Sequence, residues 1–189
     1  MLLTISITKG EMFMSVSETK TNTGKRTKLL TATAVFMAMV IALSSFGIPV
    51  PGGHLYLNDI VITTAALLLD GPHAFVACGI GAFIGDLLFY PAPMFVSLVT
   101  HGLQAVVISR LSHSRFPVKS KHSGATAVLV GAIINVIGYT AGRAYIYATP
   151  EAAGLKFPFQ MLQAGVGAFA GWLLVYRIGL KEKFRQYLR

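Results

Sequence analysis

The sequence is short of charge: only 12% of its 189 residues are Asp, Glu, Lys or Arg, against about 25% in an ordinary soluble domain. Apolar residues make up 54% and the mean hydropathy is +0.65, so too few polar side chains are present to cover a water-exposed surface. The excess apolar surface is therefore expected to face lipid. The same composition excludes a disordered chain, a collagen-like chain and a nucleic-acid-binding tail.

Cysteine and the common catalytic motifs are also scarce or missing. The single cysteine, Cys78, lies inside an apolar run, which excludes an intrachain disulfide and a cysteine-based metal site. No Gly-x-x-x-x-Gly-Lys-Ser/Thr loop occurs, so this chain does not hydrolyse a nucleotide by the P-loop route. His-Glu-x-x-His and Gly-x-Ser-x-Gly are absent too, and the five histidines are dispersed. We therefore expect no enzyme, no bound metal and no cofactor.

Six runs with little or no charge predict membrane-spanning helices, because about 20 apolar residues cross the roughly 30 Å hydrocarbon core. The second run is too short to cross unaided, and we interpret it as a short or tilted helix shielded by its neighbours. The fold class is therefore expected to be an all-α integral membrane protein with six transmembrane helices. The runs are Leu29–Ile48, Leu57–Leu69, His73–Tyr90, Met94–Ser109, Gly124–Gly142 and Phe157–Tyr176.

The basic residues predict the orientation, because cytoplasmic flanks carry the excess of Lys and Arg. Fourteen of the 16 lie before the first span, after the fourth or after the last, and the other two are Arg143 and Lys156. Six spans place these three clusters on one face, so both termini are expected in the cytoplasm. Lys156 is then expected in an outer loop, Ala148–Lys156.

The domain organisation follows from these spans. We expect a cytoplasmic tail over residues 1–28, one membrane domain over 29–180 and a basic cytoplasmic tail over 181–189. Translation could start at Met1 or at Met14. The residues before Met14 are either an overextended start or a disordered tail, and disorder is favoured.

Polar side chains inside the spans gather in the half of the membrane away from the basic clusters. An ionised group near the bilayer centre costs roughly 3 kcal/mol on insertion scales, so such groups are seldom kept without a role. Together they describe a pocket open to the outside, with aromatic walls and a few fixed hydrogen-bonding groups. The candidate substrate-binding residues are Asn58, Asp86, Tyr90, His101, Gln104, Asn135, Tyr139, Arg143 and Gln163.

Each candidate has a purely structural alternative. Asp86 and Arg143 lie at comparable depth and could simply neutralise each other as a salt bridge. His101 could be a satisfied buried histidine, and the amide side chains could hold helices together. The tyrosines near the outer surface, including Tyr56 and Tyr147, are typical of an interfacial aromatic belt. The clustering of these groups in one region favours a site.

Several segments resemble a transporter family. The runs Gly53-His-Leu-Tyr-Leu-Asn-Asp-Ile-Val-Ile62, Gly79-Ile-Gly-Ala-Phe-Ile-Gly-Asp-Leu-Leu88, Tyr90-Pro-Ala-Pro93 and His101-Gly-Leu103 are similar to the substrate-binding S components of energy-coupling factor (ECF) vitamin transporters. Within that family they resemble the branch associated with hydroxymethylpyrimidine and pyridoxine. The resemblance covers roughly residues 29–111, and its best motif is the stretch 86–93. It implies six helices, both termini inside, and a vitamin pocket near the outer face capped by the loops after helices one, three and five.

The resemblance also implies partners. Ala34, Ala38 and Ala42 repeat at every fourth position of the first helix, and spacing alone favours packing inside the protein. The resemblance instead implies that this stripe docks on a transmembrane coupling subunit driven by two cytoplasmic ATPase subunits, in the plasma membrane of a prokaryote. No nucleic acid partner is expected.

The choice of substrate stays open because the chain departs from the branch. Asn58 stands where the branch often has Gly, and His101 stands where it often has Lys. Hydroxymethylpyrimidine or pyridoxine is the expected ligand, with pantothenate or riboflavin as the alternative. A different class remains possible: a proton- or ion-coupled secondary transporter in which Asp86, His101 and Arg143 form the relay.

Overall fold

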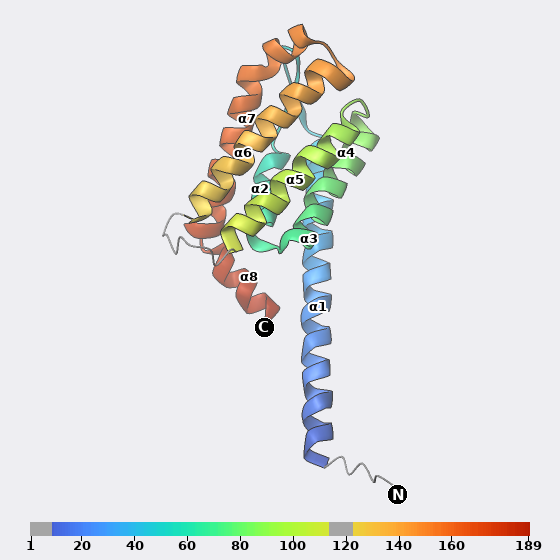
Figure 1. Cartoon of the computed structure of the whole chain (residues 1–189), viewed down its shortest axis with the longest axis vertical. Helices are drawn as coiled ribbons and strands as arrows, with labels where there is room; N and C mark the ends of the chain where they lie inside the picture. Colours follow the sequence, from blue (N-terminus) through green and yellow to red (C-terminus); the bar gives the residue numbers. More distant parts are fainter. Residues whose placement is uncertain (1–8, 114–122) are drawn as a thin grey trace, which may run out of the picture.

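The computed structural model describes residues 9–113 and 123–189. The first helix, α1 (Lys9–Ser44), has 36 residues, and its N-terminal half extends away from the helical bundle (Figure 1). The expectation of disorder before Met14 is therefore wrong from Lys9 onward, while residues 1–8 lie outside the described part. Three of the basic residues predicted in the loop after the fourth span, at 115, 119 and 121, also lie outside it.

The chain leaves α1 in a short hairpin where the sequence predicted the end of a helix and a loop. Strands β1 (Gly47–Val50) and β2 (Gly53–Tyr56) pair antiparallel. Pro51 and Gly52 form the turn, and Gly53 is the first residue of β2. Gly52 and Gly53 have φ of 78° and 150°, values that residues with a Cβ rarely adopt. The predicted span to Ile48 is thus four residues too long, because the helix stops at Ser44.

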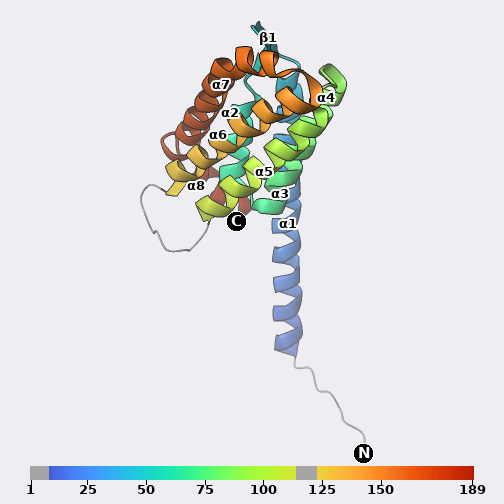
Figure 2. The ribbon, with the colours of Figure 1, turned by 45° about the horizontal axis from the view of Figure 1, so that its top comes forward.

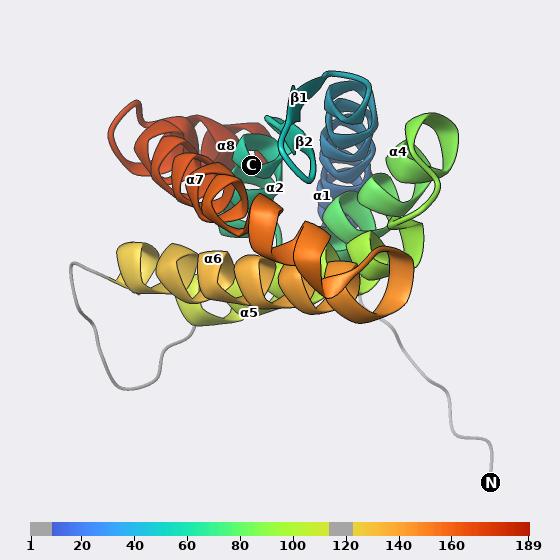
Figure 3. The same cartoon turned by 90° about the horizontal axis from the view of Figure 1, so that it is seen from above.

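The short apolar run after the hairpin forms helix α2 (Asn58–Leu68), and ten of its 11 residues are buried. It packs against α1, α5 (Met94–His113) and α7 (Pro150–Tyr176), and Figure 3 shows it enclosed within the bundle. The prediction of a short helix shielded by its neighbours is confirmed. Close approach to α7 depends on Gly167, because a Cβ there would meet the Cβ of Asp59 at 2.5 Å.

The remaining helices follow the predicted runs, with π-helical turns in two of them. In the described part of the chain, five helices are long and apolar enough to cross a membrane, namely the 23–44 part of α1, the continuous segment Gly71–Phe89, α5, α6 with η2, and α7. The elements are α3 (Gly71–Phe75), η1 (Val76–Ile80), α4 (Gly81–Phe89), α5 (Met94–His113), α6 (Ser123–Gly142), η2 (Arg143–Tyr147), α7 (Pro150–Tyr176) and α8 (Leu180–Leu188).

Helix α7 begins where the sequence predicted an outer loop. Pro150 occupies its first turn, where a missing N–H is tolerated, and the Thr149 hydroxyl caps the helix by accepting from the Ala152 N–H at 3.3 Å. The predicted loop Ala148–Lys156 is therefore mostly helix, and Lys156 is only 2% exposed. A lysine usually marks the surface and therefore predicts a loop, but the Lys156 ammonium is buried against the Gln163 side chain.

The two ends of the molecule differ in what they carry. The start of α1 and the C-terminal helix α8 lie at one end of the molecule, and the β1–β2 hairpin lies at the other (Figures 1 and 2). The hairpin end also holds the connection between η2 and α7. The intramembrane polar groups predicted from the sequence gather toward this hairpin end.

Candidate substrate-binding site

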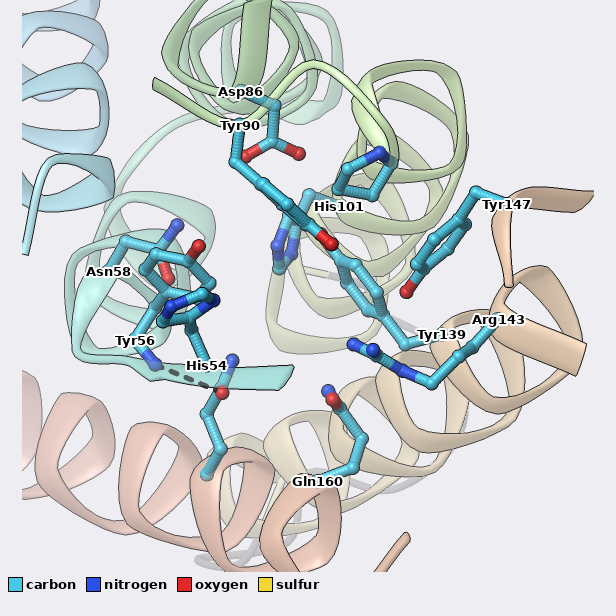
Figure 4. A pocket seen from close by; sticks show the side chains of 12 residues that line it. His54, Tyr56, Asn58, Asp86, Tyr90, His101, Tyr139, Arg143, Tyr147 and Gln160 are labelled. Carbon is cyan, nitrogen blue, oxygen red and sulfur yellow. Dashed lines mark hydrogen bonds between the residues drawn. The ribbon is translucent and has the colours of Figure 1, made fainter. Parts of the chain in front are cut away.

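A small cavity lies under the hairpin (Figure 4). It is lined by side chains from β2, α2, α4, α5, α6, η2 and α7 and from the connection between α4 and α5. The space open to the centre of a water molecule is about 30 Å³, enough for about two waters. The free space in the site is thus small in this conformation. Its lining residues are His54, Tyr56, Asn58, Asp86, Tyr90, Pro93, His101, Tyr139, Arg143, Tyr147, Gln160 and Gln163.

Seven of the nine predicted binding residues line this cavity, and Gln104 and Asn135 do not. Asn135 is 0% exposed, and its Nδ2 donates to Asp59 Oδ1 at 2.8 Å and to Gln104 Oε1 at 3.2 Å. Gln104 Oε1 also lies 2.9 Å from His101 Nδ1. Both amides therefore support the floor of the cavity from the side away from the hairpin.

Five lining residues were not among the predicted set. Tyr56 and Tyr147 were weighed as belt residues, whereas they face the cavity. Gln160 is one of the amide side chains weighed as holding helices together, and its Nε2 donates to Asn135 Oδ1 at 2.7 Å. His54 comes with the hairpin, which has no periodic apolar pattern to predict it. The fifth residue is Pro93.

Asp59 is the centre of a buried network that sequence reasoning missed. Its carboxylate is 1% exposed and accepts from Asn135 at 2.8 Å and from Gln163 Nε2 at 2.6 Å. The ring of His101 lies 3.8 Å from the same carboxylate. A buried polar group is costly unless partnered, and these partners come from α5, α6 and α7. Asp59 therefore ties four helices together beneath the cavity.

Gln163 joins the network to the hairpin. Its Oε1 accepts from the backbone N–H of Tyr56 at 3.1 Å and from Lys156 Nζ at 3.5 Å, while its Nε2 donates to Asp59. The amide thus bridges a buried cation and a buried anion, which lowers the cost of placing both inside the bundle. Although Gln163 lines the cavity, its polar atoms already hold β2 and α2 in place.

Asp86 sits on the α4 side of the cavity and is held by a hydroxyl relay. The hydroxyl of Ser97 donates to Asp86 Oδ2, so its single proton is used. The hydroxyl of Tyr139, 2.6 Å from Ser97 Oγ, must then be the donor of that second bond. The ring of Tyr139 also packs against His101, with ring centres 5.2 Å apart. The carboxylate is anchored while keeping accepting capacity toward the cavity.

Arg143 forms a hydrogen bond to the hairpin and does not pair with Asp86. Its Nη1 donates to the carbonyl of Gly52 at 2.5 Å, and the guanidinium lies 5.2 Å from the ring centre of Tyr147. Among the described side chains no ion pair joins Arg143 to Asp86. The salt-bridge alternative is therefore wrong, and both residues remain part of the cavity wall.

Aromatic rings from β2 and from the end of α4 form one part of the cavity wall. The ring of His54 lies 5.8 Å from that of Tyr90 and 6.2 Å from that of Tyr56. Burial, and to a lesser degree the nearby Asp86, raises the pKa of Tyr56 to about 12, so its hydroxyl stays protonated at physiological pH. In the described part of the chain, no group of three His, Cys, Asp or Glu side chains is placed to hold a metal ion.

The small-residue stripe of α1 lies on the surface. Ala34, Ala38 and Ala42 are all exposed, so the expectation from spacing alone, that they pack inside the protein, is wrong. Exposed neighbours such as Val35 and Met39 extend the same apolar surface.

A bundle of apolar helices with a small polar cavity closed by a hairpin defines a membrane protein built around a binding site. Residues 24–180 match the family model described as "ECF-type riboflavin transporter, S component". The match spans most of the chain, and the chain belongs to this family. It is therefore a membrane transport protein, the S component of an ECF transporter, as the resemblance implied.

One curated relative adds to this comparison. The chain is 28% identical over 148 residues to a protein of Pyrococcus woesei described as "Uncharacterized protein in gap 3'region". The aligned region covers 75% of this chain and 97% of the relative. The similarity thus extends over almost the whole of that protein.

Proposed function

We propose that this S component captures a single-ring heteroaromatic vitamin or vitamin precursor, with hydroxymethylpyrimidine or pyridoxine as the preferred ligand. The observation on which the proposal depends is the small cavity with aromatic walls and several fixed polar groups. Opening about 30 Å³ to admit one ring requires less movement of the walls than admitting a fused three-ring ligand. The family membership supplies the wider context of vitamin uptake.

The chemistry of the walls supports a ring with polar substituents. Tyr90, Tyr139 and Tyr147 offer faces and edges on which a flat ring stacks. Asp86 and Asn58 offer accepting atoms at one side, and Arg143 offers a donor at another. Such a mixture of aromatic walls and a few directed polar groups is typical of small-molecule sites.

The proposed orientation places the cavity toward the outside. The start of α1 and α8 lie at the same end of the molecule (Figure 1), and the described basic residues outside the spans lie toward that end, which favours a cytoplasmic location for both termini. The buried α2 would then complete a six-segment topology in the plasma membrane of a prokaryote. The hairpin would cap the site from outside.

The energy for import would come from partners. The chain has no P-loop motif, so in this proposal it is not an enzyme and it docks on a transmembrane coupling subunit that carries two cytoplasmic ATPase subunits. The exposed stripe Ala34, Ala38 and Ala42 is the proposed docking surface, because small side chains let helix backbones approach closely in lipid.

Riboflavin is the second candidate ligand, because the matching family model is described by that vitamin. Riboflavin carries a three-ring system and a polar chain, so its binding would require the hairpin and the aromatic wall to move apart. A riboflavin site would therefore show a large structural difference between the ligand-free and the bound protein.

A thermal-shift screen of the detergent-purified chain tests the proposal, because a ligand that binds only the folded state raises its Tm. The panel is hydroxymethylpyrimidine, pyridoxine, thiamine, riboflavin, pantothenate and folate. We expect hydroxymethylpyrimidine or pyridoxine at about 100 times its Kd to raise the Tm by about 5–10 °C. A shift with riboflavin alone would favour the second candidate, and no shift with any compound would contradict both.

Two variants serve as a matched pair in this screen. Asp86→Asn removes the charge from the cavity wall and is expected to abolish most of the shift. Ile137→Val changes a lipid-facing side chain of α6 that is 63% exposed and is expected to keep it. An equal shift in both variants would place the ligand elsewhere.

A further inference from the structure

Three buried side-chain atoms of the cavity wall have no hydrogen-bond partner among the described residues. They are His54 Nδ1, Asn58 Oδ1 and the hydroxyl oxygen of Tyr147. They come from β2, α2 and η2, and Figure 4 shows all three residues around the same cavity. Leaving a buried polar atom unpaired carries the full cost of removing it from water, so three of them in one small cavity point to a missing partner.

The orientation of the Asn58 amide is fixed by its neighbours. Its Nδ2 donates to Ser44 Oγ at 3.3 Å. The Ser44 hydroxyl donates its single proton to the carbonyl of Val40 at 3.0 Å, so it can only accept from Asn58. Turning the amide over would place two acceptors against each other. The unpaired atom is therefore the oxygen, and Asn58 presents an acceptor while being only 5% exposed.

A second acceptor lies on the same side of the cavity. Asp86 accepts from Ser97, and a carboxylate has further lone pairs to offer. Ser97 in turn receives the proton of Tyr139, so neither hydroxyl of this relay has a proton left for a ligand. The side of the cavity formed by α2 and α4 thus offers hydrogen-bond acceptors, and it favours a ligand that carries donors there.

Other groups of the cavity wall can complete the set. The Tyr147 hydroxyl can donate or accept, and His54 Nδ1 can do either according to its tautomer. Arg143 has one Nη1 bond committed to Gly52 and further N–H groups to offer. These three residues can therefore bind the acceptors of a ligand.

We propose that the ligand carries hydrogen-bond donors, an amino or hydroxyl group, on the edge that faces Asn58 and Asp86, and that His54 and Tyr147 bind its remaining polar atoms. These four residues select for an amino- or hydroxymethyl-substituted ring over a ring with methyl groups at those positions. The inference rests on the proposed function and narrows the substrate class of the same site. It assigns to His54 and Tyr147 a role in recognition.

The first test needs no ligand. Tyr147→Phe removes a hydroxyl that has no hydrogen-bond partner in the described part of the chain, so the Tm of the ligand-free chain is expected to stay within about 1 °C of that of the wild type. Tyr139→Phe is the matched control, because it removes a hydroxyl bonded to Ser97, and it is expected to lower the Tm by about 2–4 °C. An equal fall in both variants would mean that the Tyr147 hydroxyl is already paired, and it would overturn the inference.

The second test measures Kd by titration calorimetry with the panel compound that gives the largest thermal shift. Tyr147→Phe and Asn58→Leu are each expected to weaken binding about tenfold or more, as expected for the loss of a hydrogen bond of about 1.4 kcal/mol. With hydroxymethylpyrimidine, the analogue that carries a methyl in place of the amino group should lose at least as much. Unchanged affinity in both variants would overturn the inference even though the chain binds the vitamin.

The two levels of the proposal fail in different ways. If no vitamin of the panel binds the wild type, the proposed function is contradicted, and the Tyr147→Phe and Tyr139→Phe pair still decides whether the cavity holds unpaired atoms. If a vitamin binds and the variants bind it equally well, the function stands and the recognition residues are wrong.

Discussion

At the scale of single residues, the polar groups divide into those that face the cavity and those that support it. Asn135 belongs to the second group, since it bonds with Asp59, Gln104 and Gln160. Asn135→Ala would remove these bonds and leave a void beside a buried carboxylate. We expect it to destabilise the fold by about 2–4 kcal/mol, seen as a lower Tm of the ligand-free chain.

The comparison for this variant lies on the same helix. Ile133→Ala shortens a side chain that is 50% exposed on the outside of the bundle, and it is expected to leave the Tm nearly unchanged. A normal Tm for Asn135→Ala together with weaker ligand binding would instead make Asn135 a direct ligand contact.

The sequence predicted this region from the depth of each polar residue in the membrane. That depth follows from its position in the helix, because each helical residue advances about 1.5 Å. Depth correctly brought Asp86, His101 and Tyr139 together. It could not separate residues that point into the cavity from residues one layer below it, such as Asn135, because that depends on which face of each helix meets its neighbours. It also left Asp59 out of the predicted set, because the partners of Asp59 are spread over three other helices.

At the scale of elements, the β1–β2 hairpin is the part that closes the site. Gly52, at φ 78°, packs so tightly that a Cβ would lie 2.7 Å from the carbonyl oxygen of Ala152 and 2.9 Å from the N–H nitrogen of Lys156. We expect Gly52→Ala to displace the hairpin from α7 and to weaken vitamin binding at least tenfold, measured by titration calorimetry. Gly154→Ala is the control, because a Cβ at Gly154 meets nothing within 4 Å. Equal affinity of the two variants for the vitamin would mean that the position of the hairpin does not affect binding at the site.

The boundaries of elements show where sequence patterns stop being informative. The core of each span was predicted because apolar runs are long, and α2 was recognised as short and shielded. The hairpin was read as a loop because it has only eight paired residues and no alternation of apolar and polar positions. The first turns of α7 were missed because Lys156 is buried beside Gln163, which no local pattern reveals.

At the scale of the whole molecule, the exposed stripe of α1 is the proposed contact with the coupling subunit. We expect Ala38→Trp to abolish vitamin uptake in cells that hold the complete transporter, because the bulky ring prevents close helix approach. Vitamin binding by the purified variant is expected to be unchanged, since Ala38 is not part of the cavity wall. Ile137→Trp, also lipid-facing but on α6, should preserve both. Normal uptake by Ala38→Trp would place the docking surface elsewhere.

The most direct measurement is uptake of radiolabelled vitamin into proteoliposomes that hold this chain with or without the coupling subunit and its two ATPases. As a substrate-binding S component, the chain is predicted to need the partners and ATP, and collapse of the proton and sodium gradients should have no effect. Uptake by the chain alone that stops when those gradients collapse would contradict this, and would identify an ion-coupled secondary transporter instead.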